Sequence, residues 1–145
     1  MARGAREIIQ GTVVLDSQGL SLLLQQDERM IKRVEKARSE NFHVVISAIT
    51  ILEADPAGPA RRRRDFVLSR LHIEPVVRER ALFAAELLHR TGMRGHKHAI
   101  DSIVAATALR QVRPTIVYTS DPGDLTALCA EPDCPKDERV VVIRV

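Results

Sequence analysis

The sequence predicts an α/β protein in which helices cover both faces of a central, mostly parallel sheet of about five strands. Short β-prone runs alternate with helical segments along the chain, which is the pattern of strands joined by helical crossovers. The chain has 145 residues, of which 45% are hydrophobic and 28% charged. This length suits about one domain, and the composition excludes a disordered tail or a fibrous repeat. Residues 11–145 are therefore predicted to form a single domain after an N-terminal extension at residues 1–10.

In the first part of the chain, β-prone runs indicate strands at residues 12–15 and 42–46. Helical segments follow each strand, and the longest of them combines apolar residues at helical spacing with a charged, solvated face. These helices are expected to begin at about residue 20, to span residues 27–40, and to span residues 48–54.

Residues 55–59 contain two prolines and a glycine and interrupt regular structure. Beyond them, Gly92 and Gly95 mark the end of a helix at residues 78–90. The other elements expected in this part are a helix from residue 61 to about 71, strands at 73–77, 115–119 and 140–145, a strongly apolar helix at 98–111, and a helix beginning at 122.

Basic residues are concentrated in the middle of the chain. The 22 Lys and Arg residues and 19 Asp and Glu residues give a formal net charge of +3, yet residues 61–98 alone carry ten basic and four acidic side chains. Such a local excess indicates a surface for a polyanion. Because only four residues are aromatic, stacking of single-stranded bases on exposed rings is excluded as a main mode of binding.

Cysteine usage and hydropathy predict a cytoplasmic protein without a membrane partner. Cys129 and Cys134 are too few for a disulfide framework or a four-ligand zinc site, so reduced thiols are expected. No stretch approaches the roughly 20 apolar residues of a membrane span, and residues 1–10 lack the apolar core of a signal peptide.

Four carboxylates lie in apolar segments, where an unpaired charge costs several kcal/mol: Asp16, Glu53, Asp101 and Asp121. Asp16 and Asp121 each follow a predicted strand, which places both at one edge of the sheet. Each acid also has a structural interpretation. Asp16 and Asp121 could be helix N-caps, Asp101 could favour the positive end of its helix, and Glu53 could be exposed at a helix end.

Clustered carboxylates repel one another unless a cation neutralises them, and hard oxygen ligands select Mg²⁺ or Mn²⁺. A metal held by carboxylates can activate water and clamp the oxygens of a phosphodiester. The chemistry suggested by the four acids is therefore metal-dependent phosphodiester hydrolysis.

The segments that carry the acids follow one another at residues 14–17 (VLDS), 47–53 (SAITILE), 98–108 (HAIDSIVAATA) and 118–125 (YTSDPGDL). Their order and spacing resemble the PIN-domain nucleases, especially the VapC-like toxins of bacterial toxin–antitoxin pairs. The resemblance covers nearly the whole chain from about residue 12. It implies a PIN-like three-layer α/β/α fold and an Mg²⁺-dependent endoribonuclease, with Mn²⁺ as an alternative metal.

The resemblance implies that Asp16, Glu53, Asp101 and Asp121 are the catalytic, metal-binding acids. It also implies supporting roles. Thr119 matches a hydroxyl residue that orients a carboxylate or a metal-bound water, and Ser17 either contacts such a water or caps a helix. Asp124 is either a fifth acid or the N-cap of the next helix, and the cap is favoured.

His96 and His98 invite a metal-binding interpretation, which we disfavour. Alternate residues chelate one ion only in an extended segment, and the sequence offers no third soft ligand nearby. These side chains are instead expected to form a basic approach to Asp101 or to be solvated.

The expected partners are an RNA substrate, a protein antitoxin and a second copy of the chain. RNA is predicted to contact Arg61, Arg62, Arg63 and Arg64, for which a solvated helix face is the alternative. The antitoxin is predicted to dock an apolar segment in a groove walled by the 27–40 region and the helix after Arg61. The alternative function is a non-catalytic PIN-like module that binds RNA or protein. A receiver-like phosphate-transfer domain is disfavoured, since the sequence contains no Gly-x-x-x-x-Gly-Lys loop.

Overall fold

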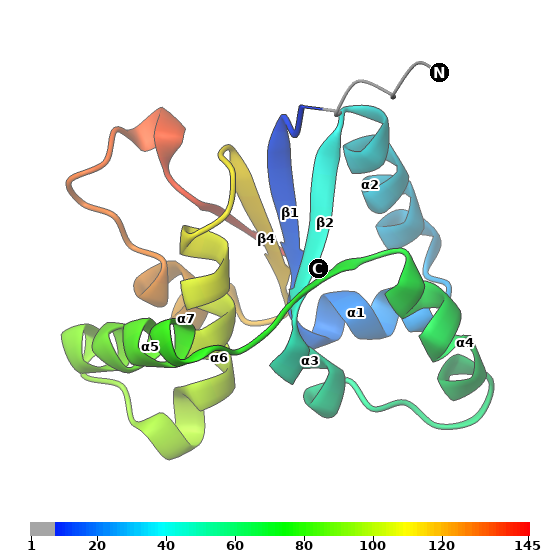
Figure 1. Cartoon of the computed structure of the whole chain (residues 1–145), viewed down its shortest axis with the longest axis horizontal. Helices are drawn as coiled ribbons and strands as arrows, with labels where there is room; N and C mark the ends of the chain where they lie inside the picture. Colours follow the sequence, from blue (N-terminus) through cyan, green and yellow to red (C-terminus); the bar gives the residue numbers. More distant parts are fainter. Residues whose placement is uncertain (1–7) are drawn as a thin grey trace, which may run out of the picture.

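The computed structural model describes residues 8–145, so the predicted extension at residues 1–10 lies largely outside the described residues. Within the described part, five strands form one sheet in the order β3-β2-β1-β4-β5, and every neighbouring pair is parallel (Figure 1). The prediction of about five mostly parallel strands is confirmed. The strands are β1 (Gly11–Leu15), β2 (Phe42–Ser47), β3 (His72–Glu74), β4 (Thr115–Thr119) and β5 (Val141–Arg144).

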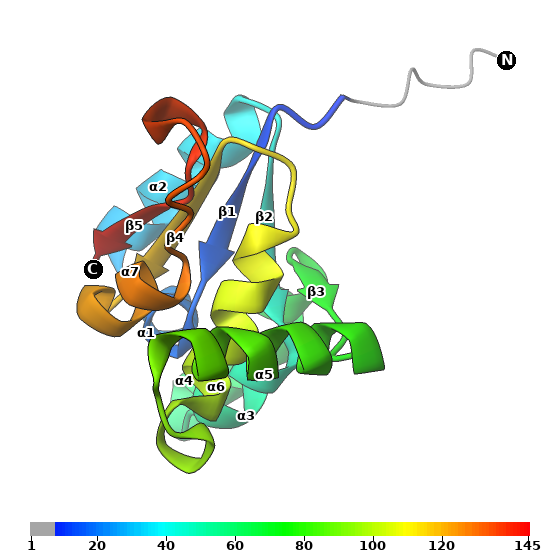
Figure 2. The same ribbon diagram turned by 90° about the vertical axis from the view of Figure 1, so that its left-hand side faces the viewer.

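Helices cover both faces of the sheet and produce three layers (Figures 1 and 2). One face carries α1 (Ser17–Leu24), α2 (Glu28–Ser39) and α4 (Gly58–Ser69). The other face carries α5 (Arg78–Thr91), α6 (Gly95–Leu109) and α7 (Pro122–Leu128). The short helix α3 (Ala48–Glu53) lies below the lower edge of the sheet in Figure 1, and a 3-10 turn, η1 (Lys136–Glu138), precedes β5. Within this described part, no helix has the length and apolar character needed to span a membrane.

The alternation of strand side chains divides the core in two. Val13 and Leu15 of β1 pack in the cluster beneath α1, α2 and α4, whereas Val14 packs in the cluster beneath α5, α6 and α7. Both faces of β1 are buried, which explains why its sequence is an unbroken apolar run.

The strand order creates a topological switch point between β1 and β4. The chain moves outward from β1 to β2 and β3, then returns to place β4 on the opposite side of β1. In open α/β sheets, ligands bind beyond the carboxyl ends of the strands at such a switch point. Here that point lies at the lower ends of β1 and β4 in Figure 1.

Several predicted boundaries are wrong. The first helix begins at Ser17 and not at about residue 20, and α4 begins at Gly58, inside the segment 55–59 that was expected to interrupt regular structure, because a proline is tolerated in the first turn of a helix. The strand expected at residues 73–77 is His72–Glu74 and stops before Pro75, which cannot donate a backbone hydrogen bond to a ladder. Gly92 ends α5 with a left-handed φ of 70°, but Gly95 is the first residue of the next helix. That helix therefore begins three residues earlier than predicted, because the backbone N–H of His98 already donates to the Arg94 carbonyl group at 2.9 Å. This shift brings His96 and His98 into the first turn of α6.

Candidate functional site

Two of the predicted acids follow the paired strands β1 and β4. Leu15 is in register with Tyr118, so Asp16 and Thr119 emerge beside each other at the carboxyl edge. Asp16 is the N-cap of α1, and its Oδ1 accepts the backbone N–H of Gly19 at 2.9 Å. The structural interpretation of Asp16 as a cap is confirmed. It is compatible with a functional role, because a capping carboxylate keeps lone pairs free.

Thr119 joins Asp16 to Asp121. Its side chain is fully buried, its hydroxyl group donates to the Asp16 carboxylate, and its Oγ1 accepts the backbone N–H of Asp121 at 3.0 Å. Burial raises the pKa of Asp16 above its ordinary value, while the hydrogen bonds from Thr119 and from the N–H of Gly19 act in the opposite direction. Thr119 thus links the Asp16 carboxylate to the backbone of Asp121.

Asp101 lies among all the other acids of this edge. It is on α6 and half-buried, and its burial is the first cause of a pKa raised to about 6. The second cause is the negative charge of four surrounding carboxylates, those of Glu53, Asp124, Asp121 and Asp16. The structure therefore gathers the four predicted acids and a fifth in one electrostatic field.

Glu53 is the exposed last residue of α3 and is held by Ser17. The Ser17 hydroxyl group donates to Oε1 of Glu53, which links α1 to α3. Ser17 is not the cap of its helix, because Asp16 has that position. Its contact with Glu53, one of the predicted site acids, was not foreseen from the sequence, since 36 residues separate the two side chains.

Asp124 is not a helix cap, contrary to the favoured interpretation. The N-cap position of α7 belongs to Asp121, whose side chain makes no capping hydrogen bond, and Pro122 begins the helix. Asp124 is in the first helical turn. Its Oδ2 lies 3.3 Å from Nδ1 of His98, and the two side chains are 34% and 15% exposed.

His98 is the site residue that the sequence analysis underestimated. Within residues 8–145, only His98, Asp101 and Asp124 bring three potential metal-ligating atoms within 4.8 Å of one another. The argument against His98 considered only a chelate with His96 in an extended segment, whereas the other two potential ligands lie on the next turn of α6 and on α7. A His-x-x-Asp spacing on one helix face was the available signal.

The arginine run on α4 has internal partners. Arg61 and Arg64 lie 3.7 and 3.3 Å from Oδ1 of Asp55. Arg63 donates from Nε and Nη2 to the Leu24 carbonyl group at 3.1 and 2.7 Å, which satisfies the C-terminal end of α1. Because Asp16 caps the other end of this eight-residue helix, roughly 12 Å of helix separate Arg63 from the acids. The RNA-binding role of the run stays a prediction.

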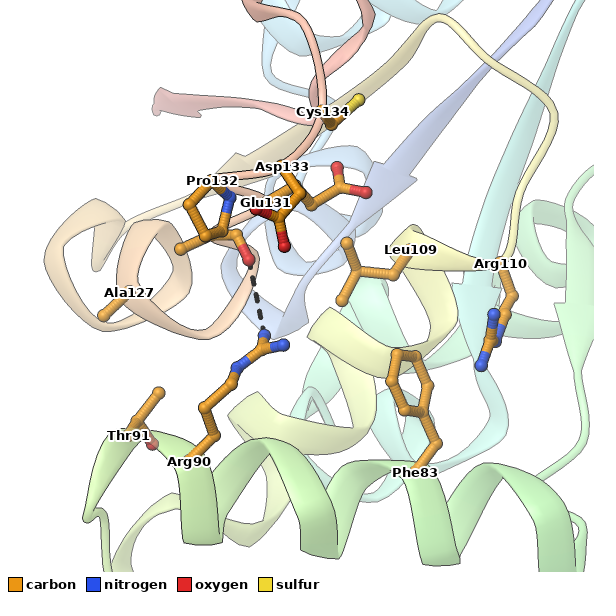
Figure 3. Close-up of a pocket in the computed structure, with 11 residues that line it drawn as sticks. Phe83, Arg90, Thr91, Leu109, Arg110, Ala127, Glu131, Pro132, Asp133 and Cys134 are labelled. Atoms are coloured by element: carbon orange, nitrogen blue, oxygen red, sulfur yellow. Dashed lines mark hydrogen bonds between the residues drawn. The ribbon is translucent and has the colours of Figure 1, made fainter.

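A hollow of about 710 Å³ lies away from the acids, between α5, α6, α7 and the loop that follows α7 (Figure 3). Arg90 donates across it to the Ala130 carbonyl group at 3.3 Å. The Glu131 carboxylate accepts from Arg113 at 2.7 and 2.9 Å, and the hydrogen bonds from this guanidinium lower the pKa of Glu131. These charged groups hold the loop in place, and none of the predicted acids lines the hollow.

The comparisons with known proteins support the fold. The sequence matches no protein-family model and no curated protein at a significant level. The structure is similar to a chain in the crystal structure of VapBC2 from Rickettsia felis bound to a DNA fragment from their promoter. The match has a TM-score of 0.63 and 15% sequence identity, and it covers 92% of this chain and 98% of that chain. Together with the parallel five-stranded sheet, it confirms the predicted PIN-like three-layer fold.

The raised pKa of Asp101 predicts a pH-dependent stability in metal-free protein. Between about pH 4, where an unfolded Asp ionises, and about 6, the folded state keeps a proton that the unfolded state loses. The free energy of unfolding therefore falls as pH rises through this window and stays lower above it. Asp101→Asn removes this loss, so its thermal midpoint in EDTA should match the wild type near pH 4 and exceed it at pH 7.

The matched control for this measurement is Asp133→Asn, an exposed acid in the loop after α7. It should follow the wild-type pH dependence. If Asp101→Asn also follows the wild-type curve, Asp101 does not carry the proton assigned to it.

Proposed function

We propose that this protein is a divalent-metal-dependent endoribonuclease and the toxin of a toxin–antitoxin pair. The observation that carries the proposal is the position of Asp101, which is repelled by Glu53, Asp124, Asp121 and Asp16 at the carboxyl edge of a PIN-like sheet. Such an accumulation of negative charge destabilises the folded protein unless a bound cation offsets the repulsion. The same cluster of carboxylates favours binding of a divalent cation.

The residues of this edge fit a divalent metal ion by their donor chemistry. The donors are mainly carboxylate oxygens, which suit Mg²⁺ and Mn²⁺, and one buried imidazole nitrogen in the cluster lacks a hydrogen-bond partner within the described chain. When bound, the cation supplies positive charge that offsets the carboxylates and the phosphate and polarises a water molecule for attack on phosphorus. Attack with release of the 3′-oxygen leaves a 5′-phosphate and a 3′-hydroxyl group.

The chain's own residues orient this chemistry. Thr119 holds the Asp16 carboxylate and the backbone of Asp121, so these two acids approach a ligand in a fixed relation. Ser17 restrains the exposed Glu53 side chain. Asp101 lies between these groups with a raised pKa, and its ionisation is favoured once positive charge enters the site.

The antitoxin part of the proposal rests on a groove between α2 and α4. The helices α2 and α4, which were predicted to form the sides of the groove, enclose a hollow of about 310 Å³. Its apolar lining includes Ile31, Val34 and Phe66. Phe66 is 66% exposed. Arg38 and Arg70 also line the groove, which suits an apolar segment flanked by carboxylates. The similarity to VapBC2 supports a protein partner of this kind. A homodimer stays a prediction.

Cleavage of a mixed RNA pool tests the nuclease. Wild-type protein with Mg²⁺ should produce fragments with 5′-phosphate ends, and EDTA should abolish them. Asp101→Asn should lose activity by about 100-fold or more, since loss of groups that only orient metal ligands already costs 10–100-fold. Asp133→Asn is the control and should cleave at the wild-type rate. Equal activity in all three proteins excludes this site, and RNA binding without cleavage favours the non-catalytic module.

Salt dependence tests the arginine run. Arg61→Gln/Arg62→Gln is the informative double variant, because Arg63 supports α1. In an Asp101→Asn background, which leaves the RNA intact, its slope of log affinity against log salt should become shallower by about 0.7 for each lost phosphate contact. The control is Arg29→Gln/Lys32→Gln on the exposed face of α2, which removes the same charge. Equal slopes in the two variants would identify the run as a solvated face.

The groove is tested by inhibition. A small protein that co-purifies from the native host should suppress RNA cleavage by the wild type and fail to suppress cleavage by Phe66→Asp, since a carboxylate is costly in an apolar contact. Leu82→Asp is the control, because Leu82 is 59% exposed on α5, across the sheet from the groove. Inhibition that survives Phe66→Asp contradicts docking in the groove.

A further inference from the structure

The imidazole of His98 is not required by the acids that suggest the nuclease. It lies in the first turn of α6, three residues before Asp101, so both side chains project from one helix face. Its Nδ1 is buried and makes no hydrogen bond within the described chain, although Oδ2 of Asp124 is 3.3 Å away. A buried nitrogen that lies beside a carboxylate without a well-aligned hydrogen bond is explained by a further group that binds both, such as an ion.

The three side chains converge from two helices on one point. One ring nitrogen of His98 and one carboxylate oxygen each of Asp101 and Asp124 all lie within 4.8 Å of one another, and Nδ1 is the nitrogen that lies 3.3 Å from Asp124. Neighbouring ligands of an octahedral ion are separated by about 3 Å and opposite ligands by about 4 Å. Small rotations of the side chains would therefore bring these atoms to one cation.

Imidazole changes which cation the donor set selects. Mg²⁺ is bound almost entirely by oxygen, whereas a nitrogen donor favours first-row transition metals. We propose that His98 Nδ1, together with the carboxylates of Asp101 and Asp124, ligates a divalent transition-metal ion and gives the centre a preference for Mn²⁺ over Mg²⁺. This assignment rests on the proposed function only in that both use the same acidic edge. The competing explanation is that His98 is a cationic partner of Asp124 and never contacts the metal.

Pulsed electron paramagnetic resonance of the Mn²⁺-loaded full chain separates the two explanations. A directly bound imidazole produces ¹⁴N modulation of the Mn²⁺ signal, and labelling with ¹⁵N-histidine should convert it to ¹⁵N modulation. His98→Gln should lose the modulation. His96→Gln is the matched control, because it removes an exposed imidazole from the same helical turn and should keep it.

Calorimetry gives a second readout that does not depend on activity. His98→Gln should weaken Mn²⁺ binding by about tenfold or more and change Mg²⁺ binding little, so that the preference between the two ions is lost. His96→Gln should bind both ions as the wild type does.

Three results would overturn the assignment: absence of nitrogen modulation from bound Mn²⁺, modulation that persists in His98→Gln, or failure of Mn²⁺ to bind. Should His98→Gln not fold, the labelled wild type and His96→Gln still decide between the explanations. If wild-type protein shows no nitrogen modulation and His98→Gln cleaves RNA in Mg²⁺ at the wild-type rate, His98 is not a metal ligand and the nuclease proposal still stands. If nitrogen modulation is present but no RNA is cleaved, His98 is a metal ligand and the nuclease proposal is wrong.

Discussion

The electrostatic repulsion of five carboxylates at one edge of a parallel sheet constrains much of the surrounding structure. Parallel strands end at the same edge, and the topology places β1 beside β4 there, so the acids that follow these strands are brought together by the fold itself. The cost appears at Asp101, whose carboxyl group has a pKa of about 6 because of burial and its acidic neighbours. The Thr119 hydroxyl group and the N-terminus of α1 donate hydrogen bonds to Asp16, and Ser17 donates one to Glu53, so two of the neighbouring carboxylates are held in position.

The elements whose residues carry a local signal could be predicted from the sequence. The apolar run before Asp16 identifies a strand that is buried on both faces, and a carboxylate that follows it lies at the sheet edge in any parallel arrangement. The strand at 73–77 was overextended because apolar residues continue beyond Pro75, whereas the proline stops the ladder. Gly95 was interpreted as a terminator, although a glycine at the first turn of a helix is also tolerated and here begins α6.

The partnership of His98 with Asp124 could not be predicted, because it depends on how α6 packs against α7. The spacing of His98 and Asp101 places both on one helix face, but it does not show that Asp124 joins them, and Asp124 itself has no local signal that distinguishes a ligand from a cap. The arginine run has the same ambiguity. Composition gives its charge, but only the packed structure shows that Arg63 satisfies the end of α1 while Arg61 and Arg64 share Asp55.

The helix α1 connects the two surfaces described above. Asp16 caps its N-terminus at the acidic edge, while Leu23 near its C-terminus lines the groove between α2 and α4, and Arg63 binds the carbonyl group of Leu24. The two ends of this eight-residue helix are about 12 Å apart, so a displacement of the whole helix at the groove also moves its capped end at the acidic edge. Occupancy of the groove and occupancy of the acidic edge are then thermodynamically linked wherever either one displaces α1, and the linkage has the same magnitude in both directions. In that case a partner that fills the groove changes the affinity of the acidic edge for a cation without contacting the acids.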